Sequence, residues 1–147
     1  MDLHDALDFV RRRHQGVLVT RRRDGRPQLS NIAYALGGGM NGSSNGDGLV
    51  RISTTASRAK ARNLLRDPAA SLYVAGDTFW SFVVVDGTAE LSAVTTAPSD
   101  AVADELVELY RAASGQEHPD WDEFRAAMVT EGRLVVRLRP VHAYGQS

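Results

Sequence analysis

Residues 16–36 read GVLVTRRRDGRPQLSNIAYAL, and this stretch decides the fold. Its hydrophobic period is two from Gly16 to Arg22 and again from Pro27 to Leu36, which predicts two β-strands. Between them stands Arg23-Asp24-Gly25-Arg26, a hairpin turn of the Asp-Gly kind. Strands joined by so short a turn run antiparallel, so we expect an antiparallel sheet.

Further elements are predicted on both sides of this hairpin. The expected strands cover residues 49–55, 71–75, 79–94 (bent near Asp86-Gly87) and 134–144. The expected helices cover 2–14 with Asp2 as cap, 58–66 with Ser57 as cap, a segment from Pro98-Ser99 to Gly115, and 120–130 with Asp120 as cap. The sequence therefore predicts an α+β protein that is mainly β, an antiparallel barrel of about six strands with peripheral helices. Side chains fill so small a barrel, so a large ligand would sit outside it or between subunits.

Composition is typical of a globular, cytoplasmic protein. The 147 residues correspond to one domain, 1–147, and 43% are hydrophobic and 24% charged. No apolar run approaches the ~18 residues of a membrane span, and the N-terminus lacks the basic start of a signal peptide. There are no cysteines, which excludes disulfides and thiolate-ligated metals. The four histidines are dispersed, and we expect no metal site.

The net charge of −1 conceals two oppositely charged halves. Residues 1–66 hold 12 Lys/Arg and 5 Asp/Glu (+7), whereas residues 67–147 hold 5 and 13 (−8). One interpretation is an anionic partner for the first half, nucleic acid or a phosphorylated small molecule. The other is that opposite charges face each other across the fold or a dimer. Lys60 is the only lysine, and its ammonium is a compact point charge rather than a planar fork.

The strongest candidate site runs from Ser53 to Asn63, where a strand ends in hydroxyl residues and a helix begins. Free N–H groups at a helix N-terminus attract anions, and Arg58, Lys60 and Arg62 would strengthen a phosphate site. Helical spacing predicts that Arg58 and Arg62 share a face and that Lys60 points about 200° away from Arg58. The alternative is a solvated basic helix face.

Two other strands carry candidate ligand contacts. Ser30 and Asn31 lie on opposite faces of the second strand, where polar side chains either read the edge of a heterocycle or face solvent. Trp80 and Phe82 share one face of the strand over 79–94, which suits stacking on a planar ligand, contact with a dimer partner or core packing. The sequence contains no motif for triad hydrolysis and no phosphate-binding glycine loop.

Together, these segments resemble the pyridoxamine 5′-phosphate oxidase-like split-barrel proteins. The resemblance rests on the order and spacing of Gly25–Asn31, Arg58–Pro68, Trp80-Ser81, Gly87–Ala89 and His142–Gly145, and extends over Tyr110-Arg111 and residues 120–130. Within that family the sequence is most similar to the branch that uses the deazaflavin coenzyme F420, the B group of the flavin/deazaflavin oxidoreductases.

This resemblance implies an FMN-binding-like split β-barrel that forms a homodimer, with two cofactor clefts between the subunits. The implied cofactor-binding residues are Arg58, Lys60 and Asn63, with Arg62 beside them, at the phosphate and ring region; Ser30, Asn31, Ser53 and Thr54 along the ring; and Trp80, Ser81 and Phe82 from the partner chain. The implied reaction is hydride transfer from reduced F420 to an electron-poor organic acceptor. The cofactor carries the reactivity, and we name no catalytic residue. The glycine-rich loop at Gly37–Gly48 is longer than usual, which weakens any inference about substrate from relatives.

Three alternatives remain. The same fold binds FMN in place of F420, with oxidase or reductase activity. A non-enzymatic protein would store F420 or sequester a tetrapyrrole. Nucleic-acid binding would use the basic first half, but the acidic second half would repel the phosphate backbone, so we expect no nucleic-acid partner and no membrane partner. The acceptor is left open among quinones, nitroaromatics, tetrapyrroles and unsaturated lactones.

Overall fold

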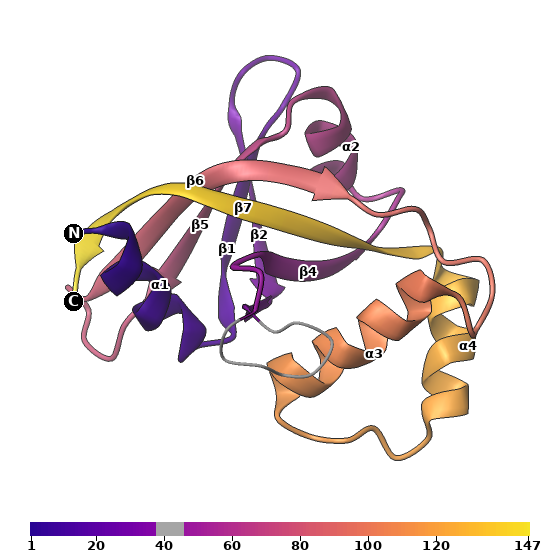
Figure 1. Ribbon diagram of the computed structural model, residues 1–147. Coiled ribbons are helices and arrows are strands. Elements are labelled where there is room, and N and C mark those ends of the chain that lie inside the picture. Colours follow the sequence, from indigo (N-terminus) through magenta and orange to yellow (C-terminus); the bar gives the residue numbers. More distant parts are fainter. Residues whose placement is uncertain (38–45) are drawn as a thin grey trace.

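The computed structural model describes residues 1–37 and 46–147, which form a curled antiparallel sheet with helices at its sides (Figure 1). The strands are β1 (Gln15–Arg21), β2 (Pro27–Ala33), β3 (Ala35–Leu36), β4 (Val50–Thr55), β5 (Ala69–Ala75), β6 (Phe82–Leu91) and β7 (Arg133–Gln146), in the order β2-β1-β5-β6-β7-β4-β3. The helices are α1 (Leu3–Arg11), α2 (Ala59–Arg66), α3 (Ala101–Ser114) and α4 (Trp121–Glu131). The predicted α+β class is confirmed. Positions 38–45 of the predicted glycine-rich loop lie outside the described residues.

β1 and β2 form the predicted hairpin. They pair antiparallel along their whole length, and Gly25 adopts a φ of 85° in the turn, where glycine is not strained. The prediction of one strand over Pro27–Leu36 is wrong, because Ala35-Leu36 leaves β1 and pairs with β4 as the separate strand β3. Tyr34 occupies the break and is completely buried; its hydroxyl donates to the carbonyl oxygen of Val10 at 2.7 Å. This side chain therefore ties the break to helix α1.

The long strands β6 and β7 bend the sheet into a half-barrel (Figure 1). Their register shifts between Asp86 and Gly87, where the sequence predicted a bend. A Cβ on Gly87 would collide with the carbonyl oxygen of Arg139, so this close backbone approach requires glycine. The first half of β7 also pairs with β4, which sets Arg133 opposite Thr55.

One face of the sheet encloses the apolar core. Its largest fully buried aliphatic side chains include Leu18, Ile52, Leu72, Val85 and Leu138. Helix α1 packs Ala6 and Val10 against this cluster, and α2 adds Leu64. None of the helices in the described ranges is both long and apolar enough to cross a membrane.

Two of the predicted helix caps are present and two helices begin elsewhere. The carboxylates of Asp2 and Asp120 cap α1 and α4, as predicted. Helix α3 begins after Asp100 rather than at Pro98-Ser99, and this carboxylate accepts backbone N–H groups that hold its pKa at about 2. Ser57 does not cap α2, which begins one residue later than expected with Arg58 at the cap position and no side-chain hydrogen bond there. The N-terminus of α2 is thus left without a side-chain cap.

Candidate functional site

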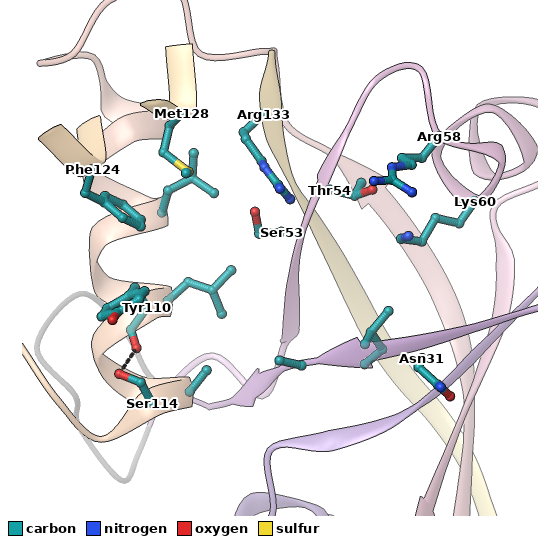
Figure 2. Close-up of a pocket in the computed structure, with 15 residues that line it drawn as sticks. Asn31, Ser53, Thr54, Arg58, Lys60, Tyr110, Ser114, Phe124, Met128 and Arg133 are labelled. Carbon is teal, nitrogen blue, oxygen red and sulfur yellow. Dashed lines mark hydrogen bonds between the residues drawn. The ribbon is translucent and has the colours of Figure 1, made fainter. Parts of the chain in front are cut away.

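A cleft of about 530 Å³ lies where β2, β4 and the start of α2 face helices α3 and α4. Figure 2 shows that its side chains come from two sides, with Arg58 and Lys60 opposite Phe124 and Tyr110. Among the described residues, none that lines the cleft is acidic. We call Arg58 and Lys60 the cationic corner. We call the set on α3 and α4 the apolar wall: Leu106, Leu109, Tyr110, Phe124 and Met128.

The cationic corner holds positive charge without a nearby counter-charge. In the described ranges, neither Arg58 nor Lys60 forms an ion pair with a carboxylate. Burial lowers the pKa of Lys60, and the positive charges of Arg58 and Arg133 lower it further. Arg133 lies between the corner and the wall and forms an ion pair with Glu131 at 2.9 Å. An anion at the corner would relieve the repulsion that lowers the pKa of Lys60.

Thr54 adds a polar group without a partner to the same corner. Its side chain is only 2% exposed, and among the residues that the structure describes its Oγ1 has no hydrogen-bond partner. Figure 2 shows this oxygen beside the guanidinium of Arg58. An unsatisfied buried hydroxyl costs about 1–3 kcal/mol, so a bound group that supplies the missing hydrogen bond would be favoured there.

The apolar wall belongs to a cluster of aromatic rings. Tyr110 and Phe124 meet at 5.2 Å between ring centroids, and Trp121 meets Phe124 at 5.4 Å, both edge to face. The guanidinium of Arg111 lies 4.8 Å from the ring centroid of Trp121. Met128 completes the wall from the next turn of α4. These contacts fix the orientation of the rings at the cleft.

Five of the residues predicted for the site line this cleft together. They are Asn31 on β2, Ser53 and Thr54 on β4, Arg58 at the cap position of α2 and Lys60 in its first turn. The prediction that Lys60 points about 200° away from Arg58 is wrong. Arg58 has extended backbone angles (φ −71°, ψ 148°), so its side chain does not follow helical spacing. Arg58 and Lys60 therefore both reach the cleft, and the exposed Arg62 does not line it.

Two more predicted residues lie outside the lining. Asn63 is buried, and its Nδ2 donates to Thr20 Oγ1 at 3.1 Å while its Oδ1 accepts from Arg66 at 3.3 Å. These bonds join α2 to β1, and they occupy the amide. Ser30 is half-buried on β2, on the face opposite to that of Asn31.

Trp80, Ser81 and Phe82 do not line the cleft of their own chain. Trp80 is 72% exposed and meets Phe79 edge to face, while Phe82 stacks on Tyr73 at 5.7 Å on the sheet. The prediction that Trp80 and Phe82 share one face of a strand over 79–94 is wrong, because β6 begins only at Phe82 and Trp80 lies in the turn before it. Trp80 is exposed, whereas Ser81 and Phe82 are half-buried.

The sequence interpretation missed Arg133 and the whole apolar wall. Leu106, Leu109 and Tyr110 have the helical spacing of an ordinary core face, and Phe124 and Met128 have no distinguishing pattern. Arg133 reaches the cleft because β7 pairs with β4, which is a contact between distant segments. A rule based on local sequence gives no signal for such a contact.

A second, wider groove of about 930 Å³ adjoins the cleft. The two share Asn31, Ile32, Ala33 and Ala113. Arg12, Arg13 and His14 lie at the other side of this groove, and Arg13 contacts Asp77 at 3.4 Å. Arg12 and Arg13 thus lie along the groove that adjoins the cleft with the cationic corner.

Possible metal ligands occur away from the cleft. Asp2, His4 and Asp5 each offer a ligand atom within 4.8 Å of the others at the exposed N-terminus. His4 Nδ1 lies 3.7 Å from Asp5 Oδ1. Exposed groups of this kind are common without a metal, and this cluster carries no assignment.

Comparison with known proteins identifies the fold. Residues 3–147 match the family described as Pyridoxamine 5′-phosphate oxidase. The chain belongs to this family. The split-barrel fold predicted from the sequence is thereby confirmed.

Solved structures with this fold have different described roles. The conserved hypothetical protein Rv2991 from Mycobacterium tuberculosis is 25% identical (TM-score 0.69), and the match covers 97% of this chain and 82% of that one. An F420 reductase is 24% identical (TM-score 0.63; 95% of each chain), and HutZ, the heme storage protein from Vibrio cholerae, is 15% identical (TM-score 0.63; 99% and 95%). Fold likeness alone therefore leaves the ligand open.

Proposed function

We propose that this protein is an F420H2-dependent reductase that transfers a hydride to an electron-poor organic acceptor. One observation carries the proposal. At the cationic corner meet an uncapped helix N-terminus and, as far as residues 1–37 and 46–147 are concerned, two cations without a carboxylate partner and a buried hydroxyl without a hydrogen-bond partner. This donor set fits a phosphate group. The family match and the likeness to an F420 reductase support the choice of a redox cofactor.

In this proposal Arg58, Lys60 and the first N–H groups of α2 hold the phosphate, and Thr54 Oγ1 donates to it. Asn31 and Ser53, which also line the cleft, hydrogen-bond to the ring. The bound cofactor supplies the hydride, while the chain binds it, orients it and excludes water. Within the part of the chain that the structure describes, no Asp, Glu or His lines the cleft, so we expect the product to take its proton from solvent.

The adjoining groove favours F420 over FMN. F420 continues beyond its phosphate into a lactyl–oligoglutamate tail, whereas FMN ends at the phosphate. Arg12 and Arg13 line the groove that leads away from the cleft, and Arg12 is exposed. Carboxylates of the tail would meet positive charge there. FMN-dependent oxidase or reductase activity is the nearest alternative.

We also propose a homodimer, because the outer face of the sheet is apolar and partly exposed. One row of side chains crosses this face at matched register positions: Asn31, Val17, Tyr73, Val84 and Tyr144. Asn31 also lines the cleft, so a second subunit on this face would border the cleft. Trp80, Ser81 and Phe82 lie at one end of the same surface, from which they would reach the cleft of the partner.

Titration with oxidised F420 and with FMN, followed by absorbance and fluorescence at several salt concentrations, tests the cofactor. We expect F420 to bind more tightly, with an affinity that increases with tail length and falls more steeply with added salt, because exposed charges are screened beyond about 8 Å at physiological ionic strength. Tighter binding of FMN at all salt concentrations would replace F420 by FMN.

A second measurement separates a reductase from a storage protein. F420H2 is mixed with a panel of quinones, nitroaromatics, tetrapyrroles and lactones, and its oxidation is followed in absorbance. Acceptor-dependent oxidation supports the reductase. Tight F420 binding without oxidation by any acceptor would instead indicate storage, and tight heme binding without F420 binding would indicate a role like that named for HutZ.

A further inference from the structure

The apolar wall exposes hydrophobic side chains inside the cleft. Helix α4 has no fully buried residue, and Phe124 and Met128 are half-buried where they face the cleft. Tyr110 on α3 is half-buried in the same way. Burying such apolar surface is favourable by roughly 25 cal/mol per Å², so a ligand that covers the wall gains affinity from it. A helix that only closed the core would bury these side chains completely.

The wall is held in place before any ligand binds. On the side of α3 toward the sheet, Glu105 accepts from Arg137 at 2.5 Å and from Arg51 at 2.8 Å. Arg125 of α4 contacts Asp104 at 2.9 Å and donates to the carbonyl oxygen of Pro98 at 2.8 Å. Because both helices are fixed by charged contacts away from the cleft, the rings form a preorganised surface for a flat partner.

Charge is distributed unevenly along the cleft. The unpaired cations are at the cationic corner, Arg133 in the middle is already paired with Glu131, and the wall itself has no charged residue. An anionic acceptor lying on the wall would lose hydration without gaining a partner, which is costly. A neutral conjugated ring would lose little and would gain contact with Tyr110 and Phe124.

We infer that the apolar wall is the acceptor subsite and that it selects a flat, uncharged, conjugated acceptor of the quinone class. This inference rests on the proposed function, in which the anionic cofactor occupies the cationic corner. The acceptor then lies between the corner and the wall. It takes the hydride from the reduced deazaflavin, which is oxidised, and one proton from solvent, so a quinone leaves as a hydroquinone.

The test compares 1,4-naphthoquinone with its 2-sulfonate, which adds one negative charge. The chain has no cysteine, so neither quinone can be consumed by thiol addition. We expect Phe124→Ala and Met128→Ala to raise KM for naphthoquinone about five- to thirtyfold, from the loss of apolar contact. Met128→Lys should shift the kcat/KM ratio at least about tenfold toward the sulfonate, because it places a cation on the wall. Leu65→Ala, an exposed apolar position on α2 outside the cleft, is the matched control.

Two binding measurements keep the inference separate from the proposed function. The Kd of oxidised F420 should stay within about twofold of the parent in the wall variants. Calorimetric titration of naphthoquinone into the F420-loaded oxidised protein should show weaker binding in them. Unchanged quinone binding and KM would overturn the subsite, as would wall variants that weaken F420 instead. Failure of the parent protein to bind F420 at all would overturn the proposed function itself.

Discussion

Two buried threonines, Thr20 and Thr54, differ in whether the hydroxyl has a hydrogen-bond partner in the described residues, so their variants distinguish effects on stability from effects on binding. Thr20 is 1% exposed and its hydroxyl accepts from Asn63, whereas the hydroxyl of Thr54 has no partner. We expect Thr54→Val to raise the free energy of unfolding by about 1 kcal/mol, because it removes an unsatisfied buried group. Thr20→Val should lower it by about 1–3 kcal/mol, because the Asn63 amide loses its acceptor. Urea unfolding measures both.

The same pair tests the site. Thr54→Val should weaken F420 binding about three- to tenfold, since it removes one hydrogen bond to the proposed phosphate. Thr20→Val should leave the Kd of F420 near that of the parent in the folded protein. A Thr54→Val variant that is less stable than the parent, with unchanged F420 binding, would show that this hydroxyl serves the fold.

We expect Lys60 to contribute strongly to the affinity for F420. Replacement by alanine should weaken F420 binding about ten- to hundredfold, the scale of a charge-assisted hydrogen bond of roughly 1.5–3 kcal/mol. Lys60→Arg should also weaken F420 binding, because the larger, planar guanidinium group does not replace a compact ammonium. Arg62→Ala is the control, because Arg62 is exposed and outside the lining. Parent-like binding by both Lys60 variants would remove this helix from the site.

The lowered pKa of Lys60 gives the sign of a pH effect. Its pKa lies below the usual lysine value of 10.5, so the ammonium loses its proton at a lower pH than an exposed lysine does. An anion binds the protonated form, so the affinity for F420 should fall as the pH rises through this lowered pKa. Lys60→Arg stays charged over the whole range. Titrations between pH 7 and 10 should therefore show the fall in the parent and a flatter profile in Lys60→Arg.

At the scale of elements, helix α3 connects the wall to the sheet through Glu105. Burial raises the pKa of Glu105, but hydrogen bonds from Arg137 and Arg51 outweigh this, and its pKa is lowered overall. Its contribution to stability is therefore complete above the usual glutamate pKa of 4.5 and is lost as the pH falls through the lowered value.

We expect Glu105→Gln to lower the free energy of unfolding by about 1–3 kcal/mol at pH 7. The variant should also lose part of the acid sensitivity of the parent below pH 4.5. Urea unfolding at pH 7 and pH 4 checks both statements, with Glu90→Gln as control, because Glu90 contacts Arg137 but is mostly exposed. An equal effect of the two variants would mean that the ion pairs on α3 act only as surface contacts.

Elements defined by local sequence were predictable, and their ends were less so. The Asp-Gly turn, the acidic caps Asp2 and Asp120 and the bend at Gly87 each depend on neighbouring residues, and the structure has all of them. The break at Tyr34 depends on a hydrogen bond to helix α1, which the strand pattern cannot reveal. The start of α2 differs for a similar reason, since Ser57 turns toward Thr55 and leaves the cap position to Arg58.

At the scale of the whole molecule, the cleft brings together residues 31–60 and residues 106–133, which are far apart in the sequence. The polar and cationic side of the cleft was predictable because Ser53 to Lys60 are consecutive in the chain. The apolar wall was not, because α3 and α4 reach the cleft only through their packing near β4 and β7. The sequence thus indicated an anion site, and the structure adds the surface from which we infer the acceptor.

The last prediction concerns the assembly. On the outer face of the sheet, Leu29 is 59% and Tyr144 49% exposed, and Leu29 stands opposite Val19 in the register. Together with the register row of Val17, Tyr73 and Val84, these side chains place exposed apolar groups on one face of the sheet, and contiguous exposed apolar groups are typical of an interface. We expect light scattering at micromolar concentration to give twice the chain mass of 16.0 kDa.

Charge placed on this face should separate the subunits. Leu29→Lys and Tyr144→Lys should shift the mass toward 16.0 kDa, whereas Leu65→Lys, more exposed and on α2, should not. If the partner supplies Trp80 to the cleft, the monomeric variants should also lose F420 affinity although their cationic corner is intact. A monomeric parent would contradict the dimer. Dissociated variants that bind F420 as tightly as the parent would show that each chain holds the cofactor alone.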